Sequence, residues 1–131
     1  MLRGSCHCGA AGWQFQGQPE KATLCNCTVC QRWGALWAHG FIGENFHISG
    51  TTNLYLRSPK TIEFRFCKIC SCVVFWCAAS KGEDGRHYGA VNLRLADPTQ
   101  ISALAVEFFD GLQTMRALDR DGTCVADILR Q

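Results

Sequence analysis

Seven closely spaced cysteines are the residues of this chain best suited to chemistry. They form three clusters: Cys6 with Cys8, Cys25 with Cys27 and Cys30, and Cys67 with Cys70. Thiolates at Cys-x-Cys and Cys-x-x-Cys spacing converge around a turn and are typical zinc ligands. Four ligands close a structural site, whereas three leave one position open to water or a substrate. The clusters therefore divide into two pairs for a closed site and one trio for an open site.

The two pairs are predicted to share one structural zinc ion. Residues two apart in a strand point to the same face, so Cys6 and Cys8 can both face a metal. Cys67-Lys68-Ile69-Cys70 has the gap of a zinc knuckle. A zinc ion held by both pairs would clamp the first strand to a distant hairpin, and structural zinc contributes about 10–16 kcal/mol in small zinc domains.

The trio, Cys25, Cys27 and Cys30, is predicted to hold a catalytic zinc ion. Three thiolates outweigh the charge of Zn²⁺ and weaken it as a Lewis acid. Such a centre suits the capture of an incoming thiol as thiolate and its delivery as a nucleophile. Arg32 follows two residues later, where it is predicted to offset the negative charge or bind a substrate carboxylate.

A closed trio is the alternative. A fourth ligand would then complete a second structural site. Cys72 is the most available candidate, and Cys77, Cys124 or a histidine are others. Removing Cys72 and measuring the zinc content separates the two interpretations, because an open trio predicts no change.

The elements that must position these cysteines are mostly strands. Short segments rich in β-formers alternate with glycines and predict a mainly β fold. The helical signals are two: 27–33, ended by Gly34, and a short helix started by Asp97 and Pro98. In 60–66 the apolar residues alternate on one face, and the continuous apolar run at 73–77 indicates a central strand covered on both faces. The predicted strands are 10–16, 36–42, 45–49, 53–57, 61–66, 72–78 and 86–93.

Length and composition favour one domain, residues 1–131, without a membrane or nucleic-acid partner. The net charge is +2, and the 13 basic residues are scattered rather than gathered into a phosphate-binding stripe. A run of 18 apolar residues and an apolar secretory segment are both missing from the sequence. We therefore expect a cytoplasmic protein whose ten cysteines favour metal over disulfides, a disulfide framework being the alternative.

These motifs resemble the glutathione-dependent formaldehyde-activating enzyme family, which has the zinc-stabilised fold of antiparallel sheets seen in Mss4-like proteins. The resemblance covers about residues 4–98. One departure is Ser71, which stands where the family usually has glycine. The matching residues are Gly4-Ser5-Cys6-His7-Cys8-Gly9-Ala10, Cys25, Cys27 and Cys30 with Arg32, Gly34 and Ala35, Phe46, Gly50, Tyr55, Ser58, Phe66-Cys67 and Cys70, Val91-Asn92-Leu93 and Leu95-Ala96-Asp97-Pro98.

The resemblance implies a carbon–sulfur lyase that joins formaldehyde to glutathione and yields S-hydroxymethylglutathione. It implies two zinc ions: a structural one on Cys6, Cys8, Cys67 and Cys70, and a catalytic one on the trio. Glutathione would be the thiol co-substrate, and the partners would be a small-molecule thiol and an aldehyde. The alternatives are a non-catalytic zinc scaffold for a macromolecular partner, and a zinc or thiol redox sensor that releases metal on oxidation.

Other residues carry weaker signals. His39 is the histidine to test as an acid or base. The tryptophans are expected in the core, with Trp33 or Trp37 beside the trio as the alternative. Further carboxylate anchors are possible, although isolated basic residues are mostly solvated; these are Arg57, Lys60, Arg65 and Arg94.

Overall fold

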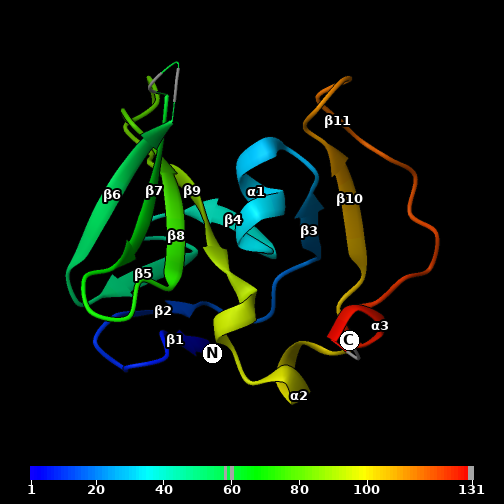
Figure 1. Ribbon diagram of the computed structural model, residues 1–131, viewed down its shortest axis with the longest axis horizontal. Helices are drawn as coiled ribbons and strands as arrows, with labels where there is room; N and C mark the ends of the chain where they lie inside the picture. The colour runs from blue at the N-terminus through cyan, green and yellow to red at the C-terminus, as the bar shows by residue number, and fades with distance from the viewer. Residues whose placement is uncertain (58, 60, 130–131) are drawn as a thin grey trace.

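Two β-sheets and three short α-helices make up the fold (Figure 1). The computed structural model describes residues 1–57, 59 and 61–129, so the expectations for Ser58 and Lys60 lie outside the described residues. The small sheet has the order β1-β2-β5 and the large one the order β11-β10-β3-β4-β9-β8-β7-β6. The prediction of a mainly β fold is confirmed.

The small sheet is antiparallel and contains β1 (Leu2–Ser5), β2 (Gly12–Phe15) and β5 (Phe46–Ser49). The large sheet contains β3 (Ala22–Cys25), β4 (Trp37–Phe41), β6 (Thr52–Arg57), β7 (Ile62–Cys67), β8 (Val73–Ala78), β9 (Tyr88–Asn92), β10 (Val106–Asp110) and β11 (Arg116–Ala117). Its strands pair antiparallel except β3 and β10, which run parallel. The helices are α1 (Thr28–Trp33), α2 (Pro98–Ile101) and α3 (Val125–Leu129), with a 3₁₀ turn η1 (Leu93–Leu95).

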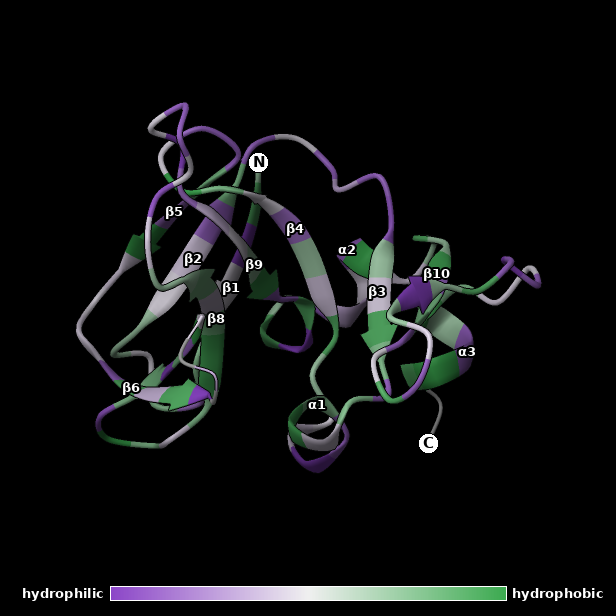
Figure 2. Ribbon diagram, turned by 90° about the horizontal axis from the view of Figure 1, so that it is seen from above, coloured by the Kyte–Doolittle hydropathy of each residue, from purple (hydrophilic) through white to green (hydrophobic). Residues whose placement is uncertain are grey.

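All seven predicted strands are present, with ends shifted by up to two residues. The apolar run 73–77 lies in β8, between β7 and β9, and β8 is largely hydrophobic in Figure 2. Both helical signals are also confirmed. Gly34 ends α1 in a left-handed conformation, with φ of 61°, and the Asp97 side chain caps α2. The sequence analysis missed β1, β3, β10, β11 and α3.

Two clusters of buried side chains hold the sheets together. The larger one is centred on Trp13, whose Nε1 donates to the carbonyl of Asn92 at 3.1 Å. Gly4 faces this indole so closely that a Cβ would stand 2.3 Å from Trp13 Cε2. The smaller cluster joins Trp37 and Phe64 to two of the trio cysteines, so the trio rests directly on the core. No helix in the described residues has the length and apolar character needed to cross a membrane.

Ser71 adopts a left-handed backbone conformation, which favours glycine over other residues. Its φ is +66°, and its N–H donates to the carbonyl of Cys67 at 3.1 Å. A left-handed conformation costs a residue with a Cβ about 1–2 kcal/mol, and the extra freedom of glycine in the unfolded chain offsets roughly half of the gain.

Ser71→Gly is therefore expected to raise the free energy of unfolding by about 0.5–1 kcal/mol, measured by urea denaturation. Ser80→Gly is the matched control, because Ser80 is an exposed serine outside the left-handed region. That control should be neutral or slightly destabilising. A Ser71→Gly protein less stable than the unmodified chain would contradict the strain argument.

Candidate metal centre and cavity

Cys6, Cys8, Cys67 and Cys70 come together at one site, and their sulfurs all lie within 4.8 Å of one another. Cys8 Sγ is 3.7 Å from Cys6 Sγ and 3.6 Å from Cys67 Sγ. A tetrahedral zinc ion with Zn–S bonds of about 2.3 Å needs sulfurs about 3.8 Å apart. The donor set and spacing therefore fit such an ion.

Backbone amides stabilise the thiolate forms at this four-cysteine site. Ile69 N donates to Cys67 Sγ and Ala11 N to Cys6 Sγ, both at 3.3 Å. Backbone donors lower the pKa of Cys67, and N–H groups of Cys72 and Cys8 lower the pKa of Cys70 to about 5. Despite the amide of Ala10, burial and contacts with Cys67, Cys6 and Cys70 raise the pKa of Cys8 to about 11. Since metals bind thiolates, Cys67 and Cys70 favour the binding form, whereas Cys8 would lose its proton on binding.

The trio forms a second group, built where β3 passes into α1. Cys25 ends the strand, Cys27 is the residue before the helix, and Cys30 lies on the helix. The three sulfurs lie within 4.8 Å of one another. Cys27 Sγ also caps the helix by accepting from Cys30 N at 3.4 Å. Helix initiation therefore brings the three sulfurs into one group.

Two further donors from distant elements point at the trio. Trp37 Nε1 donates to Cys30 Sγ at 3.3 Å, and Arg57 Nη1 to Cys27 Sγ at 3.6 Å. A hydrogen bond from Cys30 lowers the pKa of Cys25 to about 6, while the same contact raises the pKa of Cys30. Three crowded thiols cannot all ionise without a cation among them, so the group fits a metal ion.

The three cysteines considered as a fourth ligand interact with other residues, and His39 lines the same cavity without joining the close group of sulfurs. The group of close donor atoms at the trio has three members among the described residues. Cys72 lies instead beside the four-cysteine site, where its thiol interacts with Cys70. Cys77 Sγ donates to Glu63, and Cys124 Sγ donates to Asp127. This geometry favours the open trio.

The end of β10 closes over the trio, a contact that the sequence analysis missed. Asn26 accepts a hydrogen bond at Oδ1 from Gly111 N at 2.7 Å, and its backbone N–H donates to the carbonyl of Phe109 at 3.2 Å. A Cβ on Gly111 would stand 2.9 Å from Cys25 Sγ. Residue 111 must therefore be glycine for β10 to approach this closely.

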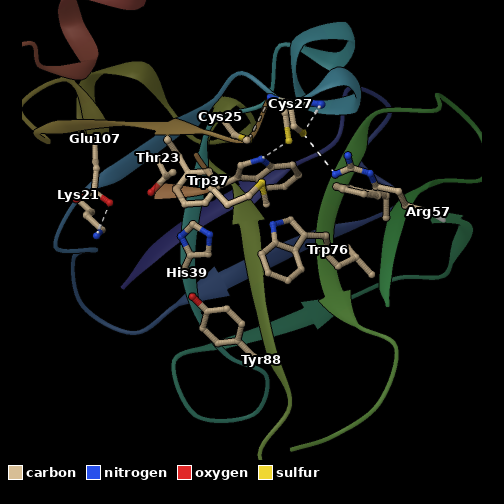
Figure 3. A pocket seen from close by; sticks show the side chains of 16 residues that line it. Lys21, Thr23, Cys25, Cys27, Trp37, His39, Arg57, Trp76, Tyr88 and Glu107 are labelled. Carbon is tan, nitrogen blue, oxygen red and sulfur yellow. Dashed lines mark hydrogen bonds and ion pairs between the residues drawn. The ribbon is translucent and has the colours of Figure 1, made fainter. Parts of the chain in front are cut away.

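A cavity of about 440 Å³ opens beside the trio (Figure 3). This volume lies within the range of small-molecule sites. The walls are mostly apolar and aromatic, with polar groups at Arg57, Thr23, His39 and the Lys21–Glu107 ion pair, whose Nζ and Oε1 are 2.7 Å apart. The apolar lining residues are Trp37, Ile62, Phe64, Trp76, Tyr88, Phe109, Gly111 and Met115.

The structure places Arg57, rather than Arg32, at the cavity. Arg32 Nη1 turns back along α1 and donates to the carbonyl of Thr28 at 2.7 Å. It lines a separate shallow hollow on the outside of α1, which Arg57 also lines. Arg65 pairs with Glu63, and Arg94 donates to the carbonyl of Gly34. Spacing in the sequence put Arg32 near the trio, but the helix directs it away.

Trp37 and His39 both line the cavity, whereas Trp33 packs outside it against Phe64 and Tyr55. Trp37 therefore lies beside the trio, as the alternative interpretation of the tryptophans predicted. The His39 ring stacks on Tyr88 with centroids 5.9 Å apart. Burial, with Lys21 nearby, lowers the pKa of His39 to about 4, so the imidazole is neutral at pH 7.

The depressed pKa of His39 predicts a loss of stability in acid. The stabilisation is fully present above the unfolded pKa of 6.5 and is lost as the pH falls towards 4, because only the unfolded chain binds the proton there. The loss should reach at most about 3 kcal/mol. His39→Gln should reduce the drop in melting temperature between pH 7 and pH 4.5, whereas His47→Gln, an exposed control on β5, should not. Equal drops in melting temperature for the unmodified protein, His39→Gln and His47→Gln would contradict the prediction.

Comparisons with known proteins identify the family and a similar fold. A solved structure of a Rhodobacter sphaeroides protein, a Northeast Structural Genomics target, superimposes with a TM-score of 0.59 and 23% sequence identity. The match covers 80% of this chain and 99% of that chain. No curated protein matches the chain. The model of one family, described as glutathione-dependent formaldehyde-activating enzyme, matches residues 1–109.

Proposed function

Because the chain belongs to the glutathione-dependent formaldehyde-activating enzyme family, we propose that it is a carbon–sulfur lyase that reversibly adds a small aldehyde to glutathione or a related thiol. The observation that carries this proposal is a group of three sulfurs exposed to one cavity, with the nearby cysteines engaged elsewhere. The reaction would take place in the cytoplasm, where thiols remain reduced.

Both cysteine groups would hold zinc. On Cys6, Cys8, Cys67 and Cys70 the ion would be structural. On the trio it would lower the pKa of an incoming thiol and hold that thiol as thiolate. Arg57 and Trp37 donate to trio sulfurs and so draw off negative charge, which keeps the group able to accept a further anion.

The reaction balances without an oxidant or reductant. The thiol gives up its proton, its sulfur attacks the carbonyl carbon, and a carbon–sulfur bond forms. The carbonyl π bond becomes an alkoxide, which takes up a proton, so that one thiol and one aldehyde give one hydroxymethyl-type thioether. Arg57, beside Cys27, is placed to donate a hydrogen bond to the developing alkoxide. Neutral His39 lies in the same cavity and could relay the proton.

The hollow outside α1 is suited to the charged part of the thiol. Arg57 lines both this hollow and the cavity, and Arg32 lines the hollow alone. Two guanidinium groups that line one hollow can each bind a carboxylate. Glutathione has two carboxylates, so its sulfur could reach the trio while its ends stay at the two arginines. We therefore propose Arg32 as a substrate anchor at this hollow rather than at the trio.

Cobalt substitution tests this function, since Co²⁺ reports thiolate binding in its visible spectrum. We expect two metal ions per chain and a spectral change on adding glutathione, with S-methylglutathione, whose sulfur is blocked, giving none. Arg57→Gln should weaken the glutathione effect about 10-fold or more. Arg3→Gln, an exposed control on β1, should not. Two bound metals without any thiol-dependent change would reject the lyase in favour of a scaffold, and metal loss on mild oxidation would indicate a redox sensor.

A further inference from the structure

We propose that the cavity beside the trio binds the organic side chain of an aldehyde larger than formaldehyde. The side chain is a flat apolar group, aromatic or of similar breadth, ending in an uncharged hydrogen-bonding group that pairs with Thr23 Oγ1. This inference rests on the proposed function and identifies the class of its aldehyde.

The size of the cavity is the first argument. Its volume is about 440 Å³. An apolar cavity of about 150 Å³ already accommodates benzene. Formaldehyde has two non-hydrogen atoms and would leave most of this space without contacts. The volume fits a ring with a substituent, with room for the carbonyl at the trio.

The shape of the walls is the second argument. Trp37 lies between the trio and His39, and Trp76 and Tyr88 line the opposite end of the cavity (Figure 3). The Trp76 and Tyr88 rings meet edge to face with centroids 5.7 Å apart. Aromatic faces and edges of this kind favour a flat aromatic guest over a flexible or charged one.

An unpaired hydroxyl is the third argument. Thr23 is 4% exposed, and among the described residues its Oγ1 is the one buried side-chain oxygen or nitrogen without a hydrogen-bond partner. Thr23 lies on β3, lines the cavity, and stands between Trp37 and the Lys21–Glu107 pair (Figure 3). Leaving a buried hydroxyl unpaired destabilises a fold, so the arrangement makes sense where a ligand supplies the partner.

The charges around Thr23 define the end group. Glu107 pairs with Lys21 at 2.7 Å and with Arg120 at 3.5 Å, and Arg120 also lies 3.9 Å from Glu20. These two positive and two negative charges balance, so this end of the cavity has no net charge for a carboxylate or an ammonium group. Arg57, the guanidinium that lines the cavity, lies beside Cys27, on the other side of Trp37 from Thr23 (Figure 3). A hydroxyl or amide can pair with Thr23 at little desolvation cost, whereas a charged group cannot.

Binding of unreactive alcohols to the metal-loaded protein tests this inference without the lyase reaction. The probes are 4-hydroxybenzyl alcohol, benzyl alcohol and 4-carboxybenzyl alcohol, followed by the fluorescence of the cavity tryptophans or by calorimetry. We expect the hydroxylated probe to bind about 3- to 10-fold more tightly than benzyl alcohol. The carboxylate should bind most weakly.

Thr23→Val keeps the side-chain shape and removes the hydroxyl. We expect it to abolish the preference for the hydroxylated probe and to raise the melting temperature by a few degrees, since the unpaired group is gone. Thr23→Ser should keep the preference, and Thr52→Val on β6 should change neither quantity.

Two results would overturn the inference: equal affinity for the three probes, or a preference that survives in Thr23→Val. If glutathione still changes the cobalt spectrum in that case, the proposed lyase function stands and only the aldehyde class is wrong. If the hydroxylated probe binds as expected but thiols leave the cobalt spectrum unchanged, the cavity assignment stands and the lyase function fails.

Discussion

Cys67→Ser is expected to leave the chain largely unfolded at 25 °C. Cys67 is buried and supplies one of four sulfurs that tie β7 to the turn after β1. Structural zinc contributes about 10–16 kcal/mol in small zinc domains, whereas the net stability of a domain is about 5–15 kcal/mol. Losing the ion is therefore expected to remove an amount of free energy comparable to the whole free energy of unfolding. Circular dichroism and metal analysis of the purified variant measure the loss.

Cys77→Ala is the matched control, because Cys77 is equally buried on the neighbouring strand β8 but belongs to neither cysteine group. It should cost about 1–2 kcal/mol and leave two metals bound. Adding a chelator to the unmodified protein should reproduce the Cys67→Ser state. A Cys67→Ser protein that melts cooperatively near the temperature of the control would show that packing alone maintains the fold.

The strands that could be predicted are those whose own residues show a clear hydrophobic pattern. Residues 62–66 alternate and 73–77 are continuously apolar, so period and length suffice to identify β7 and β8. Strand β3 has four residues and is stabilised largely by pairing with β10, more than eighty positions later. That parallel pairing brings the Lys21–Glu107 pair to the cavity, and no local pattern announces it. The missed strands are the ones that depend on distant partners.

The residues of the candidate site also divide into those that sequence spacing could predict and those that only the tertiary fold places there. The spacing of the seven cysteines predicted the two pairs and the trio, because ligands two or three positions apart must lie close together. That the two pairs share one site followed from the four ligands that a structural zinc ion needs. Arg57 approaches Cys27 from an edge strand thirty residues away, so only the tertiary fold could identify it. Arg32 lies near the trio in sequence, but a side chain on α1 can reach back four residues to the Thr28 carbonyl. Proximity along the chain predicts ligands held by a turn and fails for side chains that approach from other elements.

Cys27→Ser is expected to abolish the proposed thiol–aldehyde reaction while the protein stays folded. The trio would lose a soft ligand, and metal content should fall from two ions per chain to one. The loss in rate should be at least about 100-fold, since disturbing even the partners of a metal ligand costs 10- to 100-fold. Metal analysis and the rate of aldehyde consumption with glutathione measure the two effects.

The fold should survive because serine can replace Cys27 in its other role. Cys27 Sγ caps α1 by accepting from Cys30 N, and serine is among the best residues at that position. Metal binding and helix capping are thus separable at one residue, which Cys30→Ser, on the helix itself, does not allow. Cys124→Ser, outside both groups, should keep both metals and the full rate. If Cys27→Ser consumed aldehyde as fast as that control, the trio would have no part in the chemistry, and the cavity would need another source of nucleophile.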